Sequence, residues 1–123
     1  MNCPACKSSM IICELNQVEI DYCLTCKGIW LDSGELELIF SDGNGKNTEQ
    51  YFIHKSGYTE DKRRCPVCKK KMEKVEFEKS GIVLDKCYSH GLWFDSGELK
   101  ALLNTSAELN NKMIDLLKEM FGE

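Results

Sequence analysis

The spacing of the cysteines constrains this chain more than any other feature of its 123 residues. Seven of the eight cysteines fall into two sets of paired residues, and a histidine completes the second set. The first set is Cys3, Cys6, Cys23 and Cys26, and the second is Cys65, Cys68, Cys87 and His90. Each pair turns tightly enough to aim two ligand atoms at one point, and 16 or 18 residues separate the pairs, enough for a returning hairpin. The sequence therefore predicts two four-ligand metal sites.

The redox compartment decides whether such cysteines form disulfides or bind metal. Cys3 stands so close to the start that we expect no secretory signal before it. No apolar run approaches the roughly 18 residues that a membrane-spanning helix needs. We therefore expect a cytoplasmic protein whose reduced thiols bind metal, with a secreted fragment carrying four disulfides as the alternative.

The ligand types favour two structural zinc ions. Four soft thiolates in tetrahedral geometry leave no open coordination position, so we expect a binding protein rather than an enzyme. The second set is less regular, because one residue is missing after His90, and the longer reach of an imidazole can absorb that deletion. Two alternatives stay open: His90 is an ordinary loop residue, or the four-cysteine site holds redox iron as in electron carriers.

An internal repeat organises the chain. The pentapeptide Asp-Ser-Gly-Glu-Leu occurs identically at 32–36 and 95–99, each time soon after the last ligand of a set. Repetition of this length indicates duplication of one supersecondary unit. A unit of about forty residues rarely builds a self-sufficient core, so each copy is expected to depend on its metal.

Each copy predicts a β-hairpin followed by a short helix. Apolar residues alternate along 11–15 and 18–22 in the first copy, and along 75–77 and 82–84 in the second. The helix would begin at the repeated pentapeptide, where the aspartate and the glutamate can cap each other's backbone N–H groups. These capping pairs are Asp32 with Glu35, and Asp95 with Glu98.

The repeat divides the chain into four segments. We expect a first metal-binding unit at 1–42, a linker at 43–62, and a second unit at 63–104. Within the linker, residues 50–54 are expected to form one short strand or a packing segment. Residues 105–123 are expected to form an amphipathic helix that is too short to be stable alone. It is expected to pack on the metal-binding units or to form a homodimer through its apolar residues, which are Leu109, Met113, Leu116, Leu117, Met120 and Phe121.

Charge differs between the two copies. Residues 1–40 carry two basic and six acidic groups, a net −4, whereas residues 62–100 carry ten basic and six acidic groups, a net +4. The formal charge of the chain is −4, and the metal-bound thiolates bring it to about −7, which disfavours general nucleic-acid binding. A local basic cluster in the second copy is the candidate contact for phosphates or a protein partner, and the alternative is a solvated rim that offsets the negative thiolate site. Its members are Lys62, Arg63, Arg64, Lys69, Lys70, Lys71 and Lys74.

Four further residues carry chemistry without an obvious place in the metal sites. We expect Cys13 to be a buried apolar thiol on the inner face of its hairpin, with a redox or auxiliary-metal role as the alternative. His54 is expected to be an ordinary linker residue. Trp30 and Trp93 are expected to cover the hairpins and the metal knuckles, which are the turns that carry the paired ligands. The alternative, a base-stacking role, would need exposed rings.

Both copies carry the pattern Cys-Pro-x-Cys, then Cys-x-x-Cys or Cys-x-x-His, then Gly-Ile/Leu-Trp-Leu/Phe-Asp-Ser-Gly-Glu-Leu. This pattern, at about 3–40 and 65–103, resembles the bacterial zinc-ribbon family named for the zinc finger of transcription factor IIB. The resemblance implies a rubredoxin-like zinc ribbon in each copy. The predicted fold class is therefore a small, metal-stabilised α+β protein with two such ribbons, each a β-hairpin plus a short helix, and a C-terminal amphipathic helix.

The resemblance also guides the functional expectation, since the family is often labelled nucleic-acid binding. We expect a non-catalytic zinc-binding module that contacts nucleic acid or the transcription machinery. The alternative is a protein–protein adaptor or self-associating module that uses the C-terminal helix.

Overall fold

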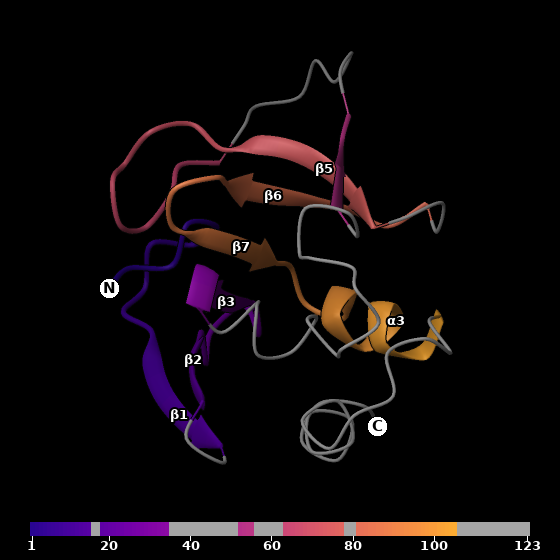
Figure 1. The fold of residues 1–123 in the computed structure, drawn as a ribbon. Coiled ribbons are helices and arrows are strands. Elements are labelled where there is room, and N and C mark those ends of the chain that lie inside the picture. Colours follow the sequence, from indigo (N-terminus) through magenta and orange to yellow (C-terminus); the bar gives the residue numbers. More distant parts are fainter. Residues whose placement is uncertain (16–17, 35–51, 56–62, 78–80, 106–123) are drawn as a thin grey trace.

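Seven strands form one sheet that runs through both repeats (Figure 1). The structure is a computed structural model that describes residues 1–15, 18–34, 52–55, 63–77 and 81–105. The strands are β1 (Ile11–Leu15), β2 (Val18–Tyr22), β3 (Ile29–Asp32), β4 (Phe52–His54), β5 (Glu73–Phe77), β6 (Val83–Cys87) and β7 (Gly91–Phe94). They lie in the order β1-β2-β3-β7-β6-β5-β4, and every neighbouring pair is antiparallel.

The predicted fold class is wrong. The described residues form a single antiparallel sheet of seven strands instead of two ribbons that each consist of a hairpin and a helix. The two copies of the repeat are called the first and the second ribbon below. The hairpins β1–β2 and β5–β6 were expected, but β3 and β7 were not. All four residues of β7 and three of the four in β3 are buried. A strand buried on both faces reads as a continuous apolar run without alternation, so its sequence hides it.

The structure describes only part of the segments that lie between and after the two copies of the repeat. Strand β4 falls within the segment expected to be a linker, and it pairs with β5, which confirms the short strand expected at 50–54. The predicted C-terminal helix and its apolar residues lie outside the described residues. The predicted segment boundaries therefore stay predictions.

Helix α3 (Glu98–Thr105) follows β7 in the second ribbon (Figure 1). One half of its expected cap is confirmed, because the Asp95 N–H donates to Glu98 Oε1 at 2.7 Å. The other half is wrong: the Glu98 N–H donates to the backbone carbonyl of Asp95. The Asp95 carboxylate instead accepts the indole N–H of Trp93 at 3.0 Å, and in the first ribbon Asp32 accepts that of Trp30 at 2.8 Å. Ser33 and Gly34 are helical in the first ribbon, and Glu35 lies outside the described residues.

The pairing of β3 with β7 joins the two ribbons, and its centre is Trp30 directly opposite Trp93. Each indole lies over a glycine of the other ribbon. A Cβ atom at Gly28 would overlap the ring of Trp93, and one at Gly91 would overlap the Leu31 carbonyl and lie 2.9 Å from Trp30 Cζ2. The contact between the ribbons therefore leaves no room for a side chain at either glycine, and Gly91 in addition has a φ of 159°.

The sheet buries apolar side chains on both faces. One face packs α3 and the alternate residues of the strands into the larger core: Ile20, Ile29, Leu31, Phe52, Val75, Phe77, Leu84, Leu92, Phe94, Leu99 and Leu102. The other face packs the two tryptophans with cysteines of both ligand sets and with Met10 and Met72. One continuous cluster thus connects the two candidate metal sites. The expectation that the tryptophans cover the knuckles is confirmed, and their complete burial excludes base stacking by these rings.

The interlock between ribbons predicts an unequal effect of two glycine substitutions. Gly91→Ala forces a methyl group into the Leu31 carbonyl and the Trp30 ring, so we expect a loss of about 1–3 kcal/mol in the free energy of unfolding. Urea denaturation of the zinc-loaded protein measures this loss. Gly34→Ala is the matched control, because no atom lies within 4 Å of the added methyl group. Equal stability of the two variants would contradict the interlock.

Candidate metal centres

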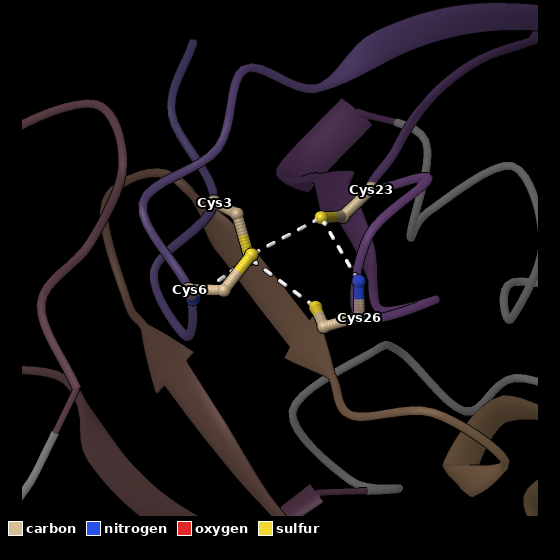
Figure 2. Close-up of side chains that lie close together, drawn as sticks. All are labelled: Cys3, Cys6, Cys23 and Cys26. Carbon is tan, nitrogen blue, oxygen red and sulfur yellow. Dashed lines mark hydrogen bonds between the residues drawn. The ribbon is translucent and has the colours of Figure 1, made fainter.

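Two knuckles bring the first ligand set together. Cys3 and Cys6 belong to the turn before β1, and Cys23 and Cys26 to the turn between β2 and β3. The sulfur atoms of Cys3 and Cys26 lie 3.4 Å apart, and those of Cys6 and Cys23 lie 3.5 Å apart. Figure 2 shows the four side chains turned toward one another, and all four sulfurs lie within 4.8 Å of each other.

The second ligand set has the same arrangement around a histidine. The sulfurs of Cys68 and Cys87 lie 3.8 Å apart, and Cys87 Sγ lies 3.5 Å from His90 Nδ1. Together with Cys65, these ligand atoms again lie within 4.8 Å of one another. The structure thus brings His90 into the ligand group instead of leaving it as an ordinary loop residue.

A tighter turn accommodates the residue that is missing after His90. In the first ribbon the Lys27 N–H closes the knuckle on the Cys23 carbonyl at 2.8 Å. In the second, the His90 N–H closes it on the Cys87 carbonyl at 3.1 Å, one residue earlier. The backbone therefore absorbs the deletion, and Gly28 and Gly91 still occupy equivalent places beside the tryptophans.

The knuckles hold three lysines in a left-handed backbone conformation. Lys7, Lys27 and Lys69 have φ values of 70°, 68° and 67°. This conformation costs a residue with a Cβ atom roughly 1–2 kcal/mol. Each of these lysines follows the second cysteine of its pair, so the turn that aims two sulfurs at one point imposes the strain.

The geometry fits zinc. With Zn–S bonds of about 2.3 Å, the edge of a regular tetrahedron is about 3.8 Å, close to the observed separations. All eight cysteines are free, and backbone N–H groups of Cys6, Cys26 and Val67 each lie 3.4 Å from a ligand sulfur as donors. Such donors stabilise thiolates. Each group can therefore hold one zinc ion through four protein ligands, a closed arrangement typical of structural sites.

Zinc binding at these sites is coupled to proton release. Without a metal, burial raises the pKa of Cys26 to about 12 and that of Cys65 to about 11. The Ser8 hydroxyl, by contrast, lowers the pKa of the exposed Cys6 to about 6. Zinc binds thiolates, so the buried thiols must lose protons when it binds, and acid favours metal release.

Two other residues with candidate roles lie away from the metal groups. Cys13 lies opposite the buried Ile20, which confirms its place on the inner face, but it is only partly buried. His54 is exposed on β4, with Nε2 3.5 Å from Glu73 Oε2.

The structure divides the predicted basic cluster. Lys62 lies outside the described residues, whereas Arg63 and Lys74 face inward and pair with aspartates. The other four cations are exposed around the first knuckle of the second ribbon. This group, called the basic knuckle below, consists of Arg64, Lys69, Lys70 and Lys71.

Sequence reasoning missed the ion-pair network that contains the two inward cations. Asp85, only 2% exposed, places Oδ1 2.7 Å from Lys74 Nζ and Oδ2 3.9 Å from Arg63 Nη1. Arg63 also pairs with Asp95. The alternation of β6 could have indicated a buried aspartate, but only the strand register shows which cation faces it.

Tyr88 was also missed as a surface feature. It lies in the second knuckle of the second metal group, is 51% exposed, and has Lys86 Nζ 5.0 Å from its ring centroid. The second ribbon thus presents an aromatic ring and the basic knuckle around one metal.

The metal assignment predicts two zinc ions per chain. Cys23→Ser and Cys65→Ser each remove one buried ligand, so each variant should retain one zinc ion, as measured by mass-spectrometric metal analysis. Cys13→Ser is the control and should retain both, because Cys13 belongs to neither group. Iron in place of zinc, or loss of zinc from the control, would contradict the assignment.

A pH dependence follows from Glu98 at the start of α3. Burial raises the pKa of its carboxyl to about 7, from an ordinary value of 4.5. The folded state therefore binds this proton more tightly than the unfolded chain, and stability falls as the pH rises from about 4.5 through about 7. Glu98→Gln keeps an oxygen acceptor for the Asp95 N–H without the charge.

We therefore expect the stability of Glu98→Gln relative to the unchanged protein to increase between about pH 6 and about pH 8. Denaturant unfolding of both zinc-loaded proteins measures the difference in stability. Acid release of zinc affects both proteins alike and therefore cancels in this difference. A pH-independent difference would contradict the assignment.

No helix within the described ranges is long and apolar enough to cross a membrane.

Comparison with known proteins agrees with the two metal groups. No curated protein and no solved structure gave a significant match. Residues 2–42 and 64–105 each match one family of zinc ribbons, described as transcription factor zinc-finger, and these two matches cover more than half of the chain. The chain therefore belongs to the transcription factor zinc-finger family and carries two tandem copies of its zinc-binding domain.

Proposed function

We propose that this protein is a non-catalytic zinc-binding module that binds nucleic acid through the second ribbon. The observation that carries the proposal is the basic knuckle, four exposed cations around one metal-binding turn. Lysine and arginine side chains grouped in this way can neutralise several phosphates at once. The description of the family as a transcription factor zinc-finger supports the same direction.

The fold makes the basic knuckle a rigid platform. Arg64 lies opposite Lys71 in a short backbone bridge, and its Nη1 donates to the Lys69 carbonyl at 3.0 Å. Lys69 Nζ donates to the Pro66 carbonyl at 3.1 Å. These partners are neutral carbonyls, so the cations stay charged and available to an anion.

Tyr88 adds a means of contacting bases. Its exposed ring belongs to the other knuckle of the same metal group. Aromatic stacking on a base contributes about 1–3 kcal/mol and requires an unpaired base. We therefore propose single-stranded nucleic acid as the preferred ligand.

The non-catalytic part of the proposal rests on the metal groups themselves. Each group already offers four protein ligands, so a substrate or a water molecule has no coordination position to take. The matched family is typical of structural zinc domains.

The proposal predicts salt-dependent binding. With four phosphate contacts to a single strand, a plot of log affinity against log salt should have a slope of about −3. The double variant Lys70→Glu/Lys71→Glu should weaken binding of a fluorescent single-stranded DNA by at least about tenfold at low salt and reduce the slope by about half. Fluorescence anisotropy of the full, zinc-loaded chain measures both.

The matched control is Lys7→Glu/Lys27→Glu, which reverses two knuckle charges in the first ribbon and should leave binding almost unchanged. Tyr88→Ala should weaken binding to the single strand more than binding to a duplex of the same length, while Tyr88→Phe should keep the affinity. An affinity that does not depend on salt concentration, or an equal loss of affinity in the control variant, would contradict the phosphate-contact proposal.

A further inference from the structure

The two ribbons can be compared residue by residue across the sheet. Directly opposed residues form one row on the face that carries the metal groups. From β1 to β5 through β7, this row is Ile12, Asp21, Trp30, Trp93, Asp85 and Lys74. The row is symmetric about the tryptophans except at its ends, where an isoleucine stands in one ribbon and a lysine in the other.

In the second ribbon, two acidic groups on this face, Asp85 and Glu76, are each paired with a cation. Asp85 pairs with Lys74 and Arg63, and Glu76 Oε1 lies 3.2 Å from Lys55 Nζ beside β4. A buried carboxylate is costly unless it is paired, so these cations stabilise the face.

The first ribbon keeps the carboxylates and lacks the cations. Asp21 is the equivalent of Asp85 and is only 8% exposed, but Ile12 and Met1 stand at the places of Lys74 and Arg63. Within the described ranges, no cation lies at ion-pair distance from Asp21. The N-terminal ammonium acts on it only from farther away.

A pair of glutamates extends this uncompensated charge. Glu14 and Glu19 lie directly opposite each other on β1 and β2, and both are exposed. Alternation along the strands places them on the same face as Ile12 and Asp21. Like charges in direct opposition are destabilising, so this arrangement costs stability unless a cation lies between them. The three carboxylates, Glu14, Glu19 and Asp21, are called the acidic strip below.

We propose that the acidic strip is a docking site for a basic segment of a partner protein. The partner's lysine or arginine side chains take the places that Lys74, Arg63 and Lys55 occupy in the second ribbon. Ile12 is 65% exposed beside Asp21 and offers an apolar surface for the aliphatic stem of such a side chain. The site is separate from the basic knuckle, so the two ribbons bind partners of opposite charge.

A synthetic peptide tests the proposal directly. The probe is an acetylated, amidated hexapeptide in which threonine alternates with lysine or arginine, titrated into the full zinc-loaded chain and followed by NMR. The expected result is saturable shifts confined to β1 and β2, weakened at high salt. Glu14→Gln/Glu19→Gln should reduce the affinity about three- to tenfold, in line with two exposed ion pairs.

Two further variants make the test specific. Ile12→Lys should pair with Asp21 within the chain, weaken peptide binding and raise the unfolding midpoint. Glu76→Gln is the matched control: Lys55 already neutralises that carboxylate, so peptide binding should not change.

Three outcomes would overturn the proposal. One is shifts spread equally over the carboxylates of both ribbons. Another is equal binding of a peptide with norleucine in place of its basic residues. The third is self-association of the unchanged protein at low salt that Glu14→Gln/Glu19→Gln removes, which would assign the strip to a second copy of the chain. None of these outcomes depends on nucleic-acid binding.

Discussion

The pairing of β3 with β7 is the constraint on which the rest of the structure depends. It brings Trp30 opposite Trp93 and requires a glycine at the place where each indole crosses the other ribbon. Through this pairing, two hairpins that are too small to fold independently share one sheet and one set of buried side chains. The metal groups then fix the turns at either side, and the tryptophans fill the space between them.

The approximate symmetry at the centre of the sheet is lost toward its edges. In the second ribbon, Lys74, Arg63 and Lys55 pair with the carboxylates of the metal face, and other cations are exposed on the basic knuckle. In the first ribbon, the three carboxylates of the acidic strip have no cation at ion-pair distance among the described residues. Duplication thus produced two surfaces of opposite charge on one rigid support, which is the property that an adaptor between an anionic ligand and a basic partner would need.

The sequence was sufficient to predict the ligand groups and the hairpins, because both depend on local spacing. Closely spaced cysteine pairs predict a knuckle directly. The alternation of apolar and polar residues in 11–15 and 18–22 predicts strands with one buried face. The sequence was insufficient to predict strands that are buried on both faces. It was also insufficient where the strand register decides which side chains are in contact. Residues 91–94 are apolar throughout, so their strand was hidden. Arg63 and Lys74 look like surface charges in sequence. The pairing of β5 with β6 places Lys74 opposite Asp85, and the ion pairs of Arg63 with Asp85 and Asp95 appear only in the folded chain.

The shared tryptophan cluster has a consequence for how the two metals behave together. Each indole is part of the wall around its own knuckles and also lies against the glycine that follows the other ribbon's last ligand by one or two residues. Loosening one knuckle therefore disturbs the packing that preorganises the other. Tandem duplication has in this way given the two metal groups a common wall, so a change at either tryptophan reaches the surroundings of both groups.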